Sequence, residues 1–101
     1  MNELYDVIIV GGGPAGLSAG IYAARARMKT LLIRSAFQPS LITVTDDVEN
    51  YPGFPQGLSG FELIDQLTRQ AERFELEILD ADAEKLVRGA DCWELTASGQ
   101  T

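Results

Sequence analysis

The sequence contains a single cysteine, Cys92, among 101 residues. One thiol cannot form an internal disulfide or a redox pair, so this chain by itself carries neither. We expect Cys92 to be a small hydrophobic residue of a strand rather than a catalytic nucleophile.

The sequence also lacks a basic cluster and a long apolar run. It has 8 basic against 15 acidic residues and a formal net charge of -7, which argues against a nucleic-acid partner. Residues Met1–Asp6 are acidic where a secretory signal is basic, and no apolar run approaches the roughly 18 residues of a membrane span. We therefore expect a cytoplasmic protein with no membrane contact.

The remaining composition is that of a folded domain. Hydrophobic residues make up 46% of the chain, charged residues 23%, and there are only 4 prolines. A chain of this length has room for one domain at most.

The first third of the chain predicts a βαβ unit. Tyr5–Val10 holds four consecutive β-branched residues before a run of glycines, which is typical of a strand buried on both faces of a parallel sheet. Pro14–Arg27 predicts a helix that is heavily buried and opens with a proline suited to a first turn. Lys29–Ile33 predicts a second strand, reached by a right-handed crossover. The helix has one polar stripe, which predicts a single wetter edge: Ser18, Tyr22 and Arg25.

The middle of the chain predicts a long loop and a capped helix. Residues 35–58 lack periodicity, and long irregular segments in compact domains are usually functional. A capping box at Ser59–Glu62 begins a helix whose outer face can pair Asp65 with Arg69. Apolar residues recur along the same helix at the spacing of a buried face: Leu63, Ile64, Leu67, Ala71 and Phe74.

The last quarter predicts strands only. Leu76–Ala81 indicates a third parallel strand, and Lys85–Val87 with Cys92–Thr96 indicates a β-hairpin. We therefore predict an α/β, Rossmann-like three-layer fold that is incomplete, with three parallel strands, two helices and the start of a β-meander. One flank of such a sheet would be an exposed apolar edge.

The glycine run at Gly11–Gly16 has the spacing G-x-G-x-x-G. In this pattern Gly11 allows the tight turn, Gly13 lets the backbone approach a pyrophosphate, and Gly16 allows close contact between helix and strand. The helix N-terminus then offers free amides and a positive dipole end to an anion. No Gly-Lys-Ser/Thr follows, so a mononucleotide P-loop is excluded and a dinucleotide is the expected ligand.

Arg34 stands where this motif usually has a carboxylate for ribose hydroxyls, at the end of the second strand. Two interpretations are open. Arg34 contacts the adenosine side of the cofactor, including a 2′-phosphate, or it is a solvated charge.

Three segments together resemble the N-terminal part of the thioredoxin reductase family: Tyr5–Ile33, Val48–Pro55 and Gly57–Phe74. The glycine run followed by Ala-Ala-Arg-Ala is common to many flavoproteins, whereas Glu49–Phe54 with the downstream helix is more specific. The resemblance implies FAD at the glycine run, and NADPH in a second, inserted domain.

The resemblance also implies roles for individual residues. Thr45 and Asn50 would lie beside the flavin, and the backbone of Ala83 would lie near the adenine. A side-chain amide suits a flavin edge that both donates and accepts hydrogen bonds, although Asn50–Gly53 also has the composition of a simple turn. The residues implied to meet the pyrophosphate are Gly11, Gly13, Pro14, Ala15 and Gly16.

Two departures from known patterns fall between Arg34 and Asn50. The family usually has Gly-Gly-Gln where this chain has Pro39–Leu41, which implies altered flavin contacts at Leu41. The segment also has no cysteine, so it cannot hold the redox pair that flavoenzymes of the glutathione reductase type place there. In the resembled family the Cys-x-x-Cys pair lies in the NADPH domain.

Residues 1–101 are accordingly expected to be the N-terminal part of an FAD-binding domain, without the NADPH domain and the remaining FAD-domain strands. The complete protein would be an NADPH-dependent thioredoxin reductase-like disulfide oxidoreductase that acts on a thioredoxin-like protein and assembles as a homodimer. The 101 residues alone would be inactive. Two alternatives stay open: a non-catalytic nucleotide-binding module or subunit, and a cysteine-free flavin-dependent ferredoxin-NADP reductase-like enzyme.

Overall fold

A computed structural model describes residues 3–35, 48 and 51–97. The elements, in chain order, are β1 (Val7–Val10), α1 (Pro14–Arg25), β2 (Thr30–Arg34), α2 (Gly60–Arg73), β3 (Glu77–Asp80), β4 (Ala83–Arg88) and β5 (Trp93–Ala97). Over the described ranges the parallel sheet has the order β1-β2-β3, and β4 and β5 form a separate antiparallel pair. The predicted α/β arrangement of three parallel strands, two helices and a hairpin is therefore confirmed for the described residues.

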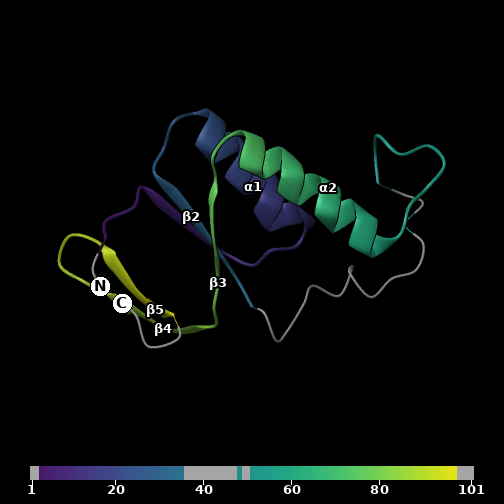
Figure 1. Cartoon of the computed structure of the whole chain (residues 1–101). Coiled ribbons are helices and arrows are strands. Elements are labelled where there is room, and N and C mark those ends of the chain that lie inside the picture. The colour runs from purple at the N-terminus through teal and green to yellow at the C-terminus, as the bar shows by residue number, and fades with distance from the viewer. Residues whose placement is uncertain (1–2, 36–47, 49–50, 98–101) are drawn as a thin grey trace.

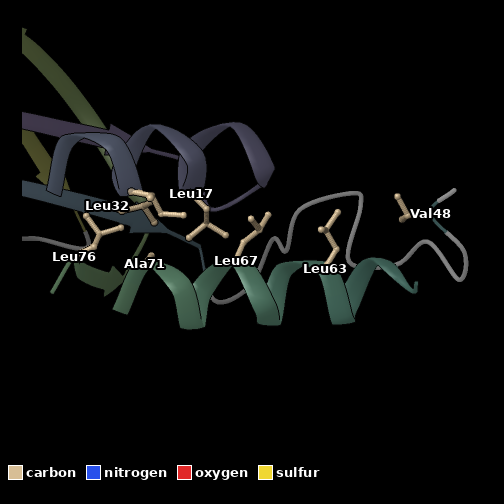
Figure 2. Close-up of a cluster of buried hydrophobic side chains, with 8 residues drawn as sticks. Leu17, Leu32, Val48, Leu63, Leu67, Ala71 and Leu76 are labelled. Atoms are coloured by element: carbon tan, nitrogen blue, oxygen red, sulfur yellow. The ribbon is translucent and has the colours of Figure 1, made fainter. Parts of the chain in front are cut away.

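The elements form three layers, with α1 and α2 on one face of the sheet and the β4–β5 hairpin on the other (Figure 1). The larger core lies between the helices and the sheet, where Leu17 of α1, Leu32 of β2 and Leu63 of α2 are fully buried (Figure 2). A smaller core lies between the sheet and the hairpin, around Leu31 and Ile33.

The strand β1 is less buried than its composition predicts. Ile9 packs against the larger core, but Ile8 is 38% exposed and Val10 is 60% exposed. The expectation of burial on both faces is therefore wrong in this structure. The physical reason is that β1 is an edge strand, and the hairpin covers the part of the opposite face formed by β2 and β3.

The helix α1 is also less buried than expected. Only one stripe of it is buried, at Leu17, Gly20 and Ile21, while Ala15 and Ala19 are exposed. An Ala-rich helix has little side-chain bulk, so apolar composition around its circumference predicts burial poorly. The prediction of heavy burial is wrong, whereas the proline at the first helical position is confirmed.

The helix α2 follows its sequence pattern closely. Leu63, Leu67 and Ala71 are buried, and Asp65 pairs with Arg69 at 3.1 Å on the outer face. Ile64 is partly buried against the core, and Phe74 at the end of the helix is 36% exposed. The predicted buried face is confirmed except at Phe74, which is the C-cap residue and so has left the helical register.

The β4–β5 hairpin is confirmed, but Cys92 is not in a strand. It lies in the connection before Trp93 and is exposed, and its carbonyl oxygen accepts a hydrogen bond from the Gly89 N–H at 2.7 Å. The expectation of a small strand hydrophobe is wrong because the turn takes up one more residue than the apolar pattern indicates.

At the start of the sheet, Tyr5 ties the segment before β1 to β3. Its hydroxyl oxygen lies 2.6 Å from Oε2 of Glu3 and 2.9 Å from Oε2 of Glu77, so the single O–H is shared between two carboxylates. The bond to Glu3, then burial, then the bond to Glu77 raise the pKa of this phenol above its ordinary value. Among the described residues, no helix is both long enough and apolar enough to cross a membrane.

Candidate functional site

The glycine turn leaves the carboxyl end of β1 and enters α1. Gly11 has φ of 125°, in the region that L side chains rarely adopt, and its N–H donates to the carbonyl of Ile33 at 2.8 Å. The turn is therefore fastened to the end of β2 by a backbone hydrogen bond. This is the tight turn that the spacing of the glycines predicts.

The position of Gly16 requires the absence of a side chain. A Cβ built there would overlap the carbonyl oxygen of Gly11 and would lie 3.4 Å from Cγ2 of Ile9. The first turn of α1 is thus packed directly on the glycine turn and β1. The sequence-based reason for a glycine here, close contact between helix and strand, is confirmed by this geometry.

The N-terminus of α1 is open. Its N-cap residue, Gly13, has no side chain, and no acidic residue occupies the first turn. Pro14 has no N–H, and the N–H groups of Ala15 and Gly16 have no carbonyl one turn earlier to accept from them. Two amides and the positive end of the helix dipole are left for an anion, so the residues present fit the pyrophosphate of a dinucleotide.

Arg34 ends β2 beside this turn. Its Nε donates to Oδ1 of Asp80 on β3 at 2.8 Å, and Nη1 lies 3.4 Å from Oγ1 of Thr68 on α2. A Cβ on Gly12 would lie 2.7 Å from Cβ of Arg34, so the arginine passes close to the glycine turn. Arg34 is paired and its side chain is 32% exposed, and its contact with the cofactor stays a prediction.

Three sequence-predicted site residues lie at or after the carboxyl ends of the parallel strands. Gly11 follows β1, Arg34 ends β2, and Ala83 comes three residues after the end of β3. Carboxyl ends of parallel strands share an edge, and in open α/β sheets ligands bind in the crevice outside that edge. Ala83 itself is exposed and pairs with Ala97 across the hairpin.

The other predicted flavin contacts, Leu41, Thr45 and Asn50, lie outside the described residues. The run next to Asn50 is described: Pro52 and Gly53 form a turn, with φ of 98° at Gly53. The interpretation of this run as a turn is therefore supported at Pro52 and Gly53. The contact of Asn50 with the flavin stays a prediction.

The run is also anchored at the start of α2. Val48 and Leu58 form an antiparallel bridge, with N–H to carbonyl distances of 2.6 and 3.1 Å. The rings of Tyr51 and Phe54 lie 6.2 Å apart, and both pack against the larger core. The described residues on either side of the turn are thus held by the bridge between Val48 and Leu58 and by packing against the larger core.

Sequence reasoning missed three residues around Arg34: Gly12, Asp80 and Thr68. Asp80 could have been found from the sequence, because it stands near the end of the third predicted strand as Arg34 stands at the end of the second. The sequence pattern did not predict the register of the two strands, which places Arg34 opposite Asp80. No cluster of three or more metal-ligating side chains occurs within residues 3–35, 48 and 51–97.

The described geometry defines a class, a Rossmann-like α/β unit with an open helix N-terminus at its glycine turn. The family model of pyridine nucleotide-disulphide oxidoreductases matches residues 5–97. The chain therefore belongs to the pyridine nucleotide-disulphide oxidoreductase family.

Within this family, the chain is similar to individual thioredoxin reductases. The chain is 48% identical over 87 residues to a thioredoxin reductase of Mycolicibacterium smegmatis, covering 84% of this chain and 28% of that protein. It is 41% identical over 101 residues to a bifunctional thioredoxin reductase/thioredoxin of Mycobacterium leprae, covering 99% of this chain and 22% of the relative. The crystal structure of an atypical thioredoxin reductase from Desulfovibrio vulgaris Hildenborough superposes with a TM-score of 0.86 at 36% identity, covering 96% of this chain and 32% of that one.

The resemblance to thioredoxin reductases drawn from the sequence is confirmed by these matches. The chain spans about a quarter of the length of the curated relatives that it matches.

Proposed function

We propose that this chain binds FAD at its glycine turn, as the N-terminal part of the FAD-binding domain of an NADPH-dependent, thioredoxin reductase-like disulfide oxidoreductase. The observation that carries the proposal is the open N-terminus of α1, where a glycine N-cap and Pro14 leave the Ala15 and Gly16 amides for an anion. The family of the chain and its likeness to thioredoxin reductases support FAD as that ligand.

In the proposed complex the pyrophosphate lies against the backbone of residues 11–16. Gly11 turns the chain, Gly13 lets the ligand approach, and the first turn of α1 donates from Ala15 and Gly16. Arg34 and Ala83 would hold the adenosine, and Leu41, Thr45 and Asn50 would hold the flavin. When bound, FAD would supply the capacity to accept a hydride from a nicotinamide and pass its two electrons on.

The proposed complete protein has parts beyond the present chain. An NADPH domain with a Cys-x-x-Cys pair would carry electrons to a thioredoxin-like protein, and the remaining strands of the FAD domain would cover β1. The exposure of Ile8 and Val10 along β1 supports a missing neighbour, either those strands or a second copy of the chain in a homodimer. Reduction of protein disulfides by NADPH belongs to a reducing compartment, so we place the protein in the cytoplasm.

The test is the flavin content of the intact gene product. We expect the purified protein to show flavin absorbance, or to acquire it on incubation with FAD, and to reduce a thioredoxin disulfide at the expense of NADPH. Flavin binding without disulfide reduction would favour a ferredoxin-NADP reductase-like enzyme. Failure to bind FAD in any preparation would contradict the proposal and leave a different nucleotide-binding module.

A further inference from the structure

Arg34 and Asp80 form an ion pair across the carboxyl ends of β2 and β3. The parallel register places the two residues opposite each other, and Nε of Arg34 donates to Oδ1 of Asp80 at 2.8 Å. Side chains alternate between the faces of a strand, and Leu32 and Ile78, two residues earlier, pack in the core beneath the helices. Both members of the pair therefore lie on the helix-facing side, which is the side on which α1 begins.

The guanidinium is held by more than its ion pair. Nη1 of Arg34 lies 3.4 Å from Oγ1 of Thr68 on α2, and the stem of the arginine passes Gly12 so closely that a Cβ there would lie 2.9 Å from Cδ. The side chain is thus fixed between the glycine turn, β3 and α2. It has little freedom to swing toward a ligand.

Asp80 is more accessible than its partner. Its side chain is 59% exposed, against 32% for Arg34. An ionised carboxylate has about four acceptor sites, so an oxygen that already accepts from one guanidinium leaves capacity for further hydrogen bonds. The more exposed charge of this pair is therefore the negative one, although the residue that ends β2 is positive.

Dinucleotide sites of this fold use a carboxylate for a free ribose 2′-hydroxyl, and an arginine for a 2′-phosphate. We propose that Asp80 supplies from β3 the ribose-facing carboxylate that β2 lacks, with Arg34 as the residue that positions it. The pair would then select an adenine dinucleotide with a free ribose 2′-hydroxyl over one with a 2′-phosphate. This inference rests on the proposed binding of FAD at the glycine turn and adds the residue that recognises its adenosine.

The selectivity follows from charge. A 2′-phosphate brought to this edge would meet first the more exposed member of the pair, the Asp80 carboxylate, which repels it, while Arg34 is less exposed and already engaged by that carboxylate. A ribose hydroxyl would instead donate to the carboxylate, in a hydrogen bond strengthened by its charge.

The test measures displacement of FAD from the intact gene product. The protein is stripped of flavin and titrated with FAD by fluorescence, and the bound FAD is then displaced with ADP-ribose or with 2′-phospho-ADP-ribose. Competition against FAD reports this site alone, whatever a separate NADPH site binds. We expect ADP-ribose to compete at least about tenfold better than its 2′-phosphorylated form. The reason is that the ribose hydroxyl of ADP-ribose would donate a hydrogen bond to the Asp80 carboxylate, whereas the 2′-phosphate would be repelled by it.

Variants assign the effect to Asp80. In Asp80→Asn we expect about tenfold weaker binding of FAD and ADP-ribose, and loss of most of the discrimination against the 2′-phosphate. Arg34→Gln should keep the discrimination, because the carboxylate remains, while weakening FAD binding by a smaller factor. The matched control is Asp65→Asn, which removes the carboxylate of the Asp65–Arg69 pair on the outer face of α2 and should change neither quantity.

Two results would overturn the assignment. One is a wild-type preference for 2′-phospho-ADP-ribose that disappears in Arg34→Gln. The other is an Asp80→Asn protein with wild-type affinity and discrimination, folded as judged by its circular dichroism and thermal midpoint. A wild-type protein that binds no FAD would instead contradict the proposed function, and this inference with it.

Discussion

The two helices begin in opposite ways, although both pack on the same face of the sheet (Figure 1). At α2 the Oγ of Ser59 accepts a hydrogen bond from the Glu62 N–H at 3.1 Å, and Glu62 adds a negative charge to the first turn. At α1 the N-cap is Gly13, and no side chain or acidic residue serves the first turn. The first turn of α2 is therefore capped by a side chain, whereas the first turn of α1 has no side-chain cap.

The difference predicts different roles for the two helix ends, stability at the start of α2 and anion binding at the start of α1. A side-chain cap contributes about 1 kcal/mol relative to alanine but only a few tenths relative to glycine, so the Gly13 N-cap costs α1 little stability. The hydroxyl of Ser59 also lies 3.2 Å from the Glu62 carboxylate, to which it donates, so the two side chains contact each other. An anion at α1 would restore there what Ser59 and Glu62 provide at α2.

The largest effect is expected from closing the space at Gly16. In Gly16→Ala the new Cβ would overlap the Gly11 carbonyl, which is backbone and cannot rotate away. We expect about 3 kcal/mol of destabilisation in chemical unfolding, typical of severe overpacking, together with loss of FAD binding by fluorescence titration.

Gly20→Ala is the matched control in the same helix. Its Cβ would meet Cδ2 of Leu76, the far end of a flexible side chain that can move. We expect a smaller loss of stability and retained FAD binding. Equal loss of binding in the two variants would mean that the turn at Gly11 has no special role.

The next effect comes from giving α1 the kind of cap that α2 has. In Gly13→Asp the φ of -79° suits any residue, and the carboxylate would accept from the Ala15 or Gly16 amide. We expect unchanged or slightly raised stability in urea unfolding, but FAD affinity lowered by about a hundredfold, because a fixed negative charge would occupy the anion site. Unchanged FAD affinity would place the cofactor elsewhere.

The smallest effect is expected at the closed helix end. Ser59→Ala removes the acceptor for the Glu62 N–H, and we expect about 1 kcal/mol of destabilisation in urea unfolding with no change in FAD affinity. A loss of affinity comparable to that of Gly13→Asp would show that the two helix ends do not divide structure from function.

Much of the fold could be predicted from local pattern. The cap at Ser59, the Asp65–Arg69 pair and the buried face of α2 depend on residues within one or two turns, and the structure confirms them. The turn at Gly11 and the close contact at Gly16 also follow from a short motif. These features are local, so their physics is contained in the neighbouring residues.

The errors share a different cause. The exposure of Ile8 and Val10 depends on which strand is at the edge of the sheet and on where the hairpin packs. The exposure of Cys92 depends on the length of the turn between β4 and β5. The exposed side of α1 depends on how closely α2 approaches it. None of these is a property of the segment that contains the residue.

By itself the sequence determined the order of the elements, the glycine turn, the contrast between an uncapped and a capped helix, and the resemblance to thioredoxin reductases. Only the tertiary structure decided which residue Arg34 pairs with. Arg34 and Asp80 are 46 positions apart, and the parallel register of β2 and β3 makes them an ion pair beside the turn. Charge at a site depends on distances through space, which a pattern along the chain does not contain.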